Sequence, residues 1–299
     1  MSTRAVARRR SGRAAVVGQR PAWRRPAGRE PHPVGREPHP VGREPHRAGR
    51  RAGRVLAPLL TVAALLTAWE GWVRLAGVPE FVLPAPSQVA RTAVEVAPLL
   101  GPHVVTTLTE AAAGLALGAV AGLLLSIVVT ASRVTGDAVY PLVVLTQTVP
   151  VVVLAPLMIL WAGFGLLPKV ILVSLTVFFP VLVSAVGAMR AVDAEHSDMV
   201  AGLGGTRLDQ FLLVRLPASV PGALAGLRVA ATYAVGAAVV AEYLAGQSGL
   251  GVFVQRSRKA YAVDQIFVGV VLIALLSGLF FALVAALTRV ATPWQRGKS

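Results

Sequence analysis

Residues 190–220 read RAVDAEHSDMVAGLGGTRLDQFLLVRLPASV and form the longest polar segment in the apolar body of the chain. Charged residues recur along it, so it is too polar to cross a bilayer. Its apolar residues recur at helical spacing, which predicts two short amphipathic helices broken at Gly204-Gly205, with Pro217 and Pro221 ending the second. Such a helix pair is suited to binding a partner protein. A re-entrant or interfacial helix is the alternative interpretation.

Six stretches of about 20 mostly apolar residues surround this segment, and each is long enough to cross a bilayer as a helix. The sequence therefore predicts an all-α integral membrane protein with about six transmembrane helices. In the second stretch, Gly114, Gly118 and Gly122 place small residues on one helix face, where another helix can approach closely. The stretches are approximately 55–76, 104–131, 139–164, 168–189, 221–244 and 266–290.

The charge of the chain is concentrated at its N-terminus. The 299 residues are 14% charged and carry a formal net charge of +15, of which residues 1–54 supply +12 from fifteen Arg and three Glu. The repeat GREPHPV in this segment contains Pro and Gly and only one apolar residue, so we predict a disordered, Arg-rich tail over 1–54. Positive charge favours the cytoplasmic side, which predicts cytoplasmic N and C termini. A transmembrane body over 55–290 and a short tail over 291–299 complete the organisation.

The composition excludes several classes of function. The chain has no Cys, and only His103 and His196 lie outside the tail, so we expect no metal site. A phosphate-binding loop needs an earlier Gly and a following helix around Gly-Lys-Ser, and Gly297-Lys298-Ser299 has neither. We therefore expect no bound ATP or other cofactor. No set of side chains suited to acid–base or nucleophilic catalysis is found, so we expect no enzyme activity. Because the basic charge is confined to the tail, we also expect no nucleic-acid partner, although a tail bound to anionic lipid or nucleic acid is the alternative to a solvated one.

The polar segment resembles the EAA loop of the membrane subunits of bacterial ATP-binding-cassette (ABC) importers. That loop reads Glu-Ala-Ala, three residues, Gly, nine residues and Ile-x-Leu-Pro. The spacing agrees throughout, but Met-Val replaces Ala-Ala and adds bulk. The matching residues are Asp198, Met199, Val200, Gly204, Val214, Leu216 and Pro217.

The resemblance extends over most of residues 55–290. Within the family, the chain is most similar to the nitrate/sulfonate/taurine subfamily. Phe81–Ser87 (FVLPAPS), Trp161 with Gly163-Phe164-Gly165, and Glu242 followed by Gly249-Leu250-Gly251 are typical of it. The resemblance implies a type I ABC importer permease fold, with the loop at 190–220 coupling it to an ATPase.

The resemblance also implies a set of partners and a location. The chain would be a multi-pass subunit of the bacterial plasma membrane, surrounded by lipid and paired with a second permease copy, normally as a homodimer. A separate ATP-binding subunit would bind ATP and receive the loop, and Asp198 would pair with a basic group there; a helix-start carboxylate is the alternative for Asp198. An extracytoplasmic solute-binding protein would deliver the substrate.

The substrate implied first is a sulfonate, nitrate or taurine. The stretch from Lys259 to Phe267 also resembles permeases for the pyrimidine precursor of thiamine, which is the second candidate. A secondary transporter or channel without an ATPase is the rival function, and it predicts buried charges for ion coupling.

Polar residues within the spans are the candidates for the translocation pathway. Gln147 and Thr148 precede Pro150, which is expected to kink the third span and expose its backbone. Helix packing is the alternative role for this pair. Glu242 lies near the outer end of the fifth span and is expected at the membrane interface, where loop anchoring is its alternative role.

Overall fold

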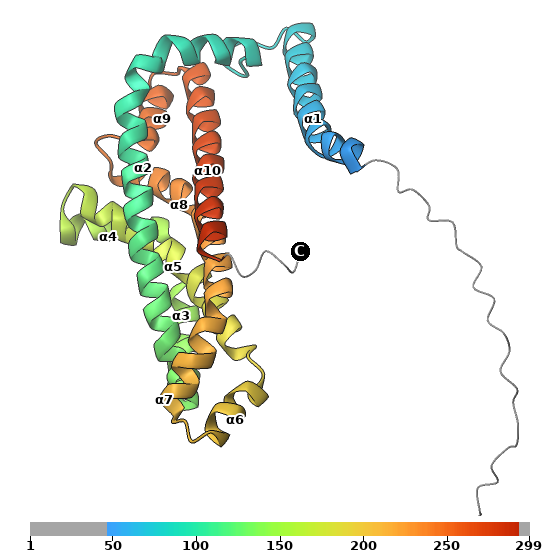
Figure 1. Ribbon diagram of the computed structural model, residues 1–299. Helices are drawn as coiled ribbons and strands as arrows, with labels where there is room; N and C mark the ends of the chain where they lie inside the picture. Colours follow the sequence, from blue (N-terminus) through green and yellow to red (C-terminus); the bar gives the residue numbers. More distant parts are fainter. Residues whose placement is uncertain (1–46, 293–299) are drawn as a thin grey trace, which may run out of the picture. The chain divides into compact units, whose positions relative to one another are not determined.

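The computed structural model describes residues 47–292, apart from the side chains of 47–55 and Arg133. Within that range every regular element is a helix and there is no strand. The predictions for 1–46 and for Gly297-Lys298-Ser299 lie outside the described residues. Figure 1 shows α1 (Arg47–Leu75), α2 (Pro86–Ala131), α3 (Arg133–Thr146), α4 (Val151–Ala162), α5 (Leu166–Arg190), α6 (Ala194–Gly202), α7 (Arg207–Gln210), the π-helical turn η1 (Phe211–Arg215), α8 (Leu216–Ala245), α9 (Leu250–Lys259) and α10 (Val263–Ala291).

Five of the described helical segments are long and apolar enough to cross a membrane, and a sixth arises when α3 and α4 are counted as one broken span. This confirms the prediction of an all-α membrane protein with about six spans. All of α2–α10, and α1 from Val55 onward, belong to one compact unit. The prediction that α1 starts near Val55 differs from the structure, in which the helix begins at Arg47.

The third span is broken rather than continuous. α3 and α4 meet at an angle of 90° across residues 147–150, so the kink predicted at Pro150 is present as a complete break in the helix. Pro150 has φ −59° and ψ 125°, and it has no N–H to donate to the preceding turn. The prolyl ring thus explains why the helix stops and restarts. Gly163 and Gly165 then connect α4 to α5.

The second span begins at Pro86, well before the predicted start near Val104. Pro98 and Pro102 lie inside this helix, which Figure 1 shows bending in its first half. Val89, Val96 and Leu100 on this part are buried at helical spacing, so packing of one face stabilises the helix despite the two prolines. A prediction from helix propensity alone places the start of α2 too late, because propensity does not include this tertiary packing.

The start of α2 is fixed by α1. Arg74 Nε donates to Glu70 Oε1 at 2.6 Å, which confirms the pairing that their four-residue spacing suggests. The Ser87 backbone N–H donates to Glu70 Oε2 at 3.0 Å, and the Ser87 hydroxyl donates to Glu70 Oε1 at 2.8 Å. The Glu70 carboxylate therefore occupies the N-terminus of α2, where free amides favour an anion.

The glycine face of α2 packs directly on α5, as the sequence predicts. A Cβ atom at Gly118 would lie 2.8 Å from the carbonyl oxygen of Ser174, and one at Gly122 would lie 2.6 Å from that of Phe178. α8 packs on α5 in the same way, since a Cβ at Gly226 of α8 would lie 2.7 Å from the carbonyl oxygen of Pro180. Small residues thus bring α2 and α8 to within backbone contact of α5, the central helix of the bundle.

We expect Gly118→Ala to lower the thermal unfolding temperature of the purified chain in detergent. The added methyl group has backbone atoms in its way, and overpacking of this kind costs about 1–3 kcal/mol. Gly278→Ala on α10 is the matched control, because nothing lies within 4 Å of a Cβ there and alanine favours a helix by roughly 1 kcal/mol. Equal unfolding temperatures for the two variants would contradict the packing described.

Candidate functional site

The segment that joins α5 to α8, residues 191–215, contains a sharp turn after α6. Gly204 has φ +85°, and its N–H donates to the Ala201 carbonyl at 2.9 Å. The Gly205 N–H donates to the Val200 carbonyl at 2.9 Å, which completes a Schellman motif at the end of α6. The left-handed conformation favours glycine, so the predicted break at Gly204-Gly205 is confirmed with its physical cause.

A capping box starts the next helix immediately after the turn. The Thr206 N–H donates to Asp209 Oδ2 at 2.8 Å, and the Asp209 N–H donates to Thr206 Oγ1 at 3.2 Å. These reciprocal bonds satisfy two free amides at the start of α7. The turn is therefore fixed from both sides by local sequence.

The second short helix does not end at Pro217 or Pro221, and that prediction is wrong. α7, η1 and α8 form one helical run of 39 residues, Arg207–Ala245. The Leu216 N–H donates to the Phe211 carbonyl, a π-helical bond, just before Pro217 enters the first turn of α8. The wider π turn accommodates a proline ring that would strain a regular α-turn, and the first helical turn needs no proline N–H. Any displacement of α7 is thus carried directly into α8.

The predicted loop residues present a partly apolar surface. Asp198, Met199, Gly204 and Pro217 are exposed, whereas Val200, Val214 and Leu216 are half-buried. Asp198 lies beyond the first turn of α6, where Glu195 is the acidic residue, so the helix-start role does not fall to Asp198. Apolar side chains are also strongly exposed on this segment: Met199 (61%), Leu203 (85%), Leu208 and Leu213.

The polar pair predicted for the pathway lies at the break between α3 and α4. Gln147, Thr148 and Pro150 are all exposed. Their hydrogen bonds are local: the Thr148 hydroxyl donates to the Leu145 carbonyl at 2.8 Å, and the Gln147 amide lies 3.4 Å from the Thr146 hydroxyl. Irregular backbone at membrane depth is tolerated where it meets protein or a cavity, so the break marks a surface that faces one of these.

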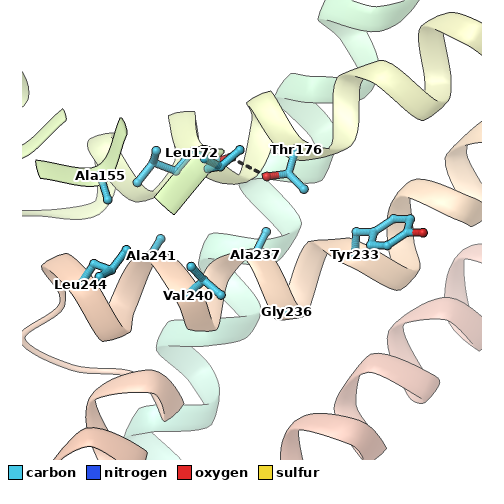
Figure 2. Close-up of a pocket in the computed structure, with 10 residues that line it drawn as sticks. Ala155, Leu172, Thr176, Tyr233, Gly236, Ala237, Val240, Ala241 and Leu244 are labelled. Atoms are coloured by element: carbon cyan, nitrogen blue, oxygen red, sulfur yellow. Dashed lines mark hydrogen bonds between the residues drawn. The ribbon is translucent and has the colours of Figure 1, made fainter. Parts of the chain in front are cut away.

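An apolar pocket of about 300 Å³ lies between α4, α5 and α8. Figure 2 shows the α8 residues from Tyr233 to Leu244 facing Leu172 and Thr176 of α5. None of the ten lining residues is charged. The Thr176 hydroxyl donates to the Leu172 carbonyl at 3.0 Å, which leaves the exposed Tyr233 side chain as the main polar group. The lining comprises Val151, Ala155, Leu172, Thr176, Tyr233, Gly236, Ala237, Val240, Ala241 and Leu244.

Glu242 is fully buried in the protein, and its contacts fit the alternative role of anchoring the turn that follows α8. Its Oε1 lies 2.6 Å from the Thr107 hydroxyl, and its Oε2 accepts from the Gly251 N–H at 2.7 Å. A Cβ at Gly249, which has φ +112°, would collide with the Glu242 carboxyl group. The typical Glu242…Gly249-Leu250-Gly251 pattern therefore reflects a carboxyl group enclosed by the turn between α8 and α9.

A buried ion pair between α2 and α5 is not among the predictions made from the sequence. The Lys169 ammonium group donates to Glu110 Oε1, and the two residues are 5% and 1% exposed. A signal was present: Gly114 faces Val173, so the residues one turn earlier on each helix, Glu110 and Lys169, also face each other. Helical periodicity in the sequence identifies the packed face of each helix, but it does not give the register of one helix against the other.

Residues 114–297 match the family described as "Binding-protein-dependent transport system inner membrane component". The chain belongs to this family. It is 32% identical to the formylaminopyrimidine transport permease of Halalkalibacterium halodurans over 82% of this chain and 98% of that one. It is 30% identical to the taurine transport system permease of Escherichia coli over 79% of this chain and 88% of that one. These relatives confirm the resemblance to the nitrate/sulfonate/taurine type of permease.

The fold agrees with this membership. An inward-facing methionine ABC transporter structure matches with a TM-score of 0.58 and 18% identity, over 66% of this chain and 97% of that one. The chain therefore has the type I ABC importer permease fold. It is a multi-pass component of the bacterial inner membrane in a family of transport subunits that are not themselves enzymes.

Lys169→Met should destabilise the chain by about 3–5 kcal/mol, because it leaves the Glu110 carboxylate buried without a counter-charge. The double variant Lys169→Met/Glu110→Gln should recover most of the loss, since it removes both charges together. Thermal unfolding in detergent, followed by tryptophan fluorescence, measures both. Two variants that are equally unstable would show that the charges are not paired.

Proposed function

We propose that this chain is the permease subunit of an ABC importer and that residues 198–217 couple it to a separate ATP-binding subunit. The observation that carries the proposal is the exposed apolar group of Met199, Leu203 and Leu208 around a turn fixed by Gly204. Exposed apolar patches of this kind mark protein–protein contacts. The spacing from Asp198 to Pro217 supports the same role.

The helical continuity of the segment supplies the mechanism. A partner that moves α6 and α7 also moves α8, because no loop absorbs the displacement between Arg207 and Ala245. α8 in turn packs backbone-to-backbone on α5 and forms one wall of the apolar pocket. A change in the ATP-binding subunit is therefore transmitted to the pathway as a movement of packed helices.

The subunit is proposed to work as a homodimer in lipid, with its loop segment and both termini in the cytoplasm. The net +12 of residues 1–54 supports this orientation. A solute-binding protein outside the membrane delivers the substrate, and ATP is bound by the partner alone, without a cofactor in this chain. The family description names dependence on a binding protein, which supports the proposed solute-binding partner.

The pocket is proposed as part of the translocation pathway, next to the break at Gln147, Thr148 and Pro150. It favours a small uncharged heterocycle of the thiamine-pyrimidine type over a sulfonate, nitrate or taurine. A desolvated anion would find no basic group among the lining residues, and burying an uncompensated charge is costly. The Tyr233 ring offers a flat surface for stacking against a planar ring.

The rival function, a secondary transporter or channel, predicts buried charges for ion coupling. The structure does hold buried ionisable residues, but Glu110 and Lys169 bond to each other, and Glu242 bonds to Thr107 and the first turn of α9. None of these three lines the pocket. Their placement favours a role in holding helices together over a role in moving an ion with the substrate.

The coupling proposal predicts that Asp198→Lys with Leu203→Asp abolishes copurification of the ATP-binding subunit and abolishes uptake. Both side chains are exposed, so the folded permease should be retained at wild-type amounts. The control is Phe81→Asp, which changes another strongly exposed apolar residue, outside the loop, and should leave copurification intact. Undiminished copurification and uptake in the double variant would refute the docking role.

The substrate proposal predicts ATP-dependent uptake of labelled formylaminopyrimidine by cells that express the whole transport system. Tyr233→Ala should reduce that uptake at least several-fold without affecting copurification of the ATP-binding subunit. An excess of unlabelled taurine should not compete. Uptake of taurine in place of the pyrimidine would overturn the substrate class, whereas uptake that continues without ATP hydrolysis would overturn the importer itself.

A further inference from the structure

A polar cluster lies inside the helical bundle, apart from the pocket and from the loop segment. It comprises His103, Thr107 and Glu110 on one face of α2, Lys169 on α5 and Glu242 on α8, together with the first turn of α9. Thr107, Glu110 and Glu242 are at most 1% exposed, and Lys169 is 5% exposed. Burying a charged group in a membrane protein costs free energy, so each ionisable group here must either have a partner or be neutral.

The side chains of the cluster satisfy the free amides at the start of α9. The Gly249 N–H donates to His103 Nδ1 at 3.0 Å, the Leu250 N–H donates to Thr107 Oγ1 at 2.9 Å, and the Gly251 N–H donates to Glu242 Oε2 at 2.7 Å. Three consecutive amides thus bond to side chains of α2 and α8. The cluster therefore positions α9 against both helices.

The Thr107 hydroxyl group lies within hydrogen-bond distance of two acceptor oxygens. Thr107 Oγ1 lies 2.6 Å from Glu242 Oε1 and 3.1 Å from the His103 carbonyl oxygen. A hydroxyl group carries one proton, so it cannot donate to both acceptors. With a proton on Glu242 Oε1, all three contacts of Thr107 are hydrogen bonds: Glu242 donates to Thr107, Thr107 donates to the His103 carbonyl, and Thr107 accepts from the Leu250 N–H.

The charges in the cluster also favour a protonated Glu242. Lys169 is paired with Glu110. His103 Nδ1 accepts a hydrogen bond from an N–H, so that nitrogen carries no proton and the ring adds no positive charge. Among the described residues that form the cluster, Lys169 is thus the one cation facing two carboxyl groups. Glu110 Oε2 has no hydrogen-bond partner in the described structure. A second carboxylate, on Glu242, would therefore be buried beside the first without a counter-charge of its own, stabilised only by its bonds to Thr107 and Gly251.

We propose that Glu242 holds a proton inside the helical bundle and, as a neutral acid, is the positioning residue that clamps the C-terminal end of α8 to α2 and to the first turn of α9. The acid donates through Oε1 to Thr107 and accepts through Oε2 from Gly251. Because α8 continues unbroken from Arg207, this clamp lies at the far end of the helix that begins in the loop segment.

The test is the infrared spectrum of the full chain in lipid nanodiscs at neutral pH. A protonated carboxyl group gives a carbonyl stretching band that a carboxylate lacks. We expect this band in the wild type and its loss in Glu242→Gln. The double variant Glu110→Gln/Lys169→Met should keep the band, since it removes only the neutral ion pair. Loss of a carboxylate band in E242Q, with no change in the acid band, would overturn the proposal.

Stability provides a second, independent readout. The side-chain amide introduced by E242Q can donate to Thr107 and accept from Gly251 as the neutral acid does, so this variant should unfold close to the wild-type temperature. Glu242→Ala loses both bonds and leaves a cavity, and should unfold well below it. E242Q that is as unstable as E242A would contradict a neutral Glu242.

A further variant covers the case in which E242Q does not fold. Thr107→Val then replaces it in the infrared measurement, because it removes the acceptor of the proposed proton while leaving the acid in place. The acid band should shift without being abolished. An unshifted spectrum would overturn the assignment.

Discussion

The contact of α2 with α5 through Gly114, Gly118 and Gly122 is the constraint on which the rest of the bundle depends. Without side chains at these positions, the two backbones approach so closely that the register between the helices is fixed. That register places Glu110 opposite Lys169 one turn away, which allows two charges to be buried in a membrane segment. α8 also approaches α5 closely, through the small residue Gly226.

The helical run from Arg207 to Ala245 connects the two ends of this bundle. At one end, the Schellman turn at Gly204 and the capping box at Thr206 fix the loop segment. At the other, Glu242 closes the turn to α9 from a fully buried position. The pocket lies along α8 between these ends, between Tyr233 and Leu244. A single rigid element therefore touches the proposed docking surface, the proposed pathway and the polar cluster.

Local sequence was sufficient for features that depend on a few neighbouring residues. The break at Gly204-Gly205 follows from a turn that requires positive φ. The pairing of Glu70 with Arg74 follows from helical spacing. The spans follow from length and hydropathy, although α2 starts earlier than predicted because tertiary packing of Val89, Val96 and Leu100 outweighs the two prolines. Local sequence also fails at Pro217, which was predicted to end a helix. The π turn accommodates this proline inside the helical run instead.

The sequence by itself determined that the chain is an all-α membrane protein, where its helical spans lie, and where the loop with the spacing from Asp198 to Pro217 turns. These features depend on composition, periodicity and local turn chemistry. Only the tertiary structure decided which polar groups share an environment. Glu110, Lys169 and Glu242 are distant in sequence, and Thr107 lies 135 residues from Glu242. Their meeting depends on the register of α2 against α5 and α8, which packing sets and which periodicity along one helix cannot specify.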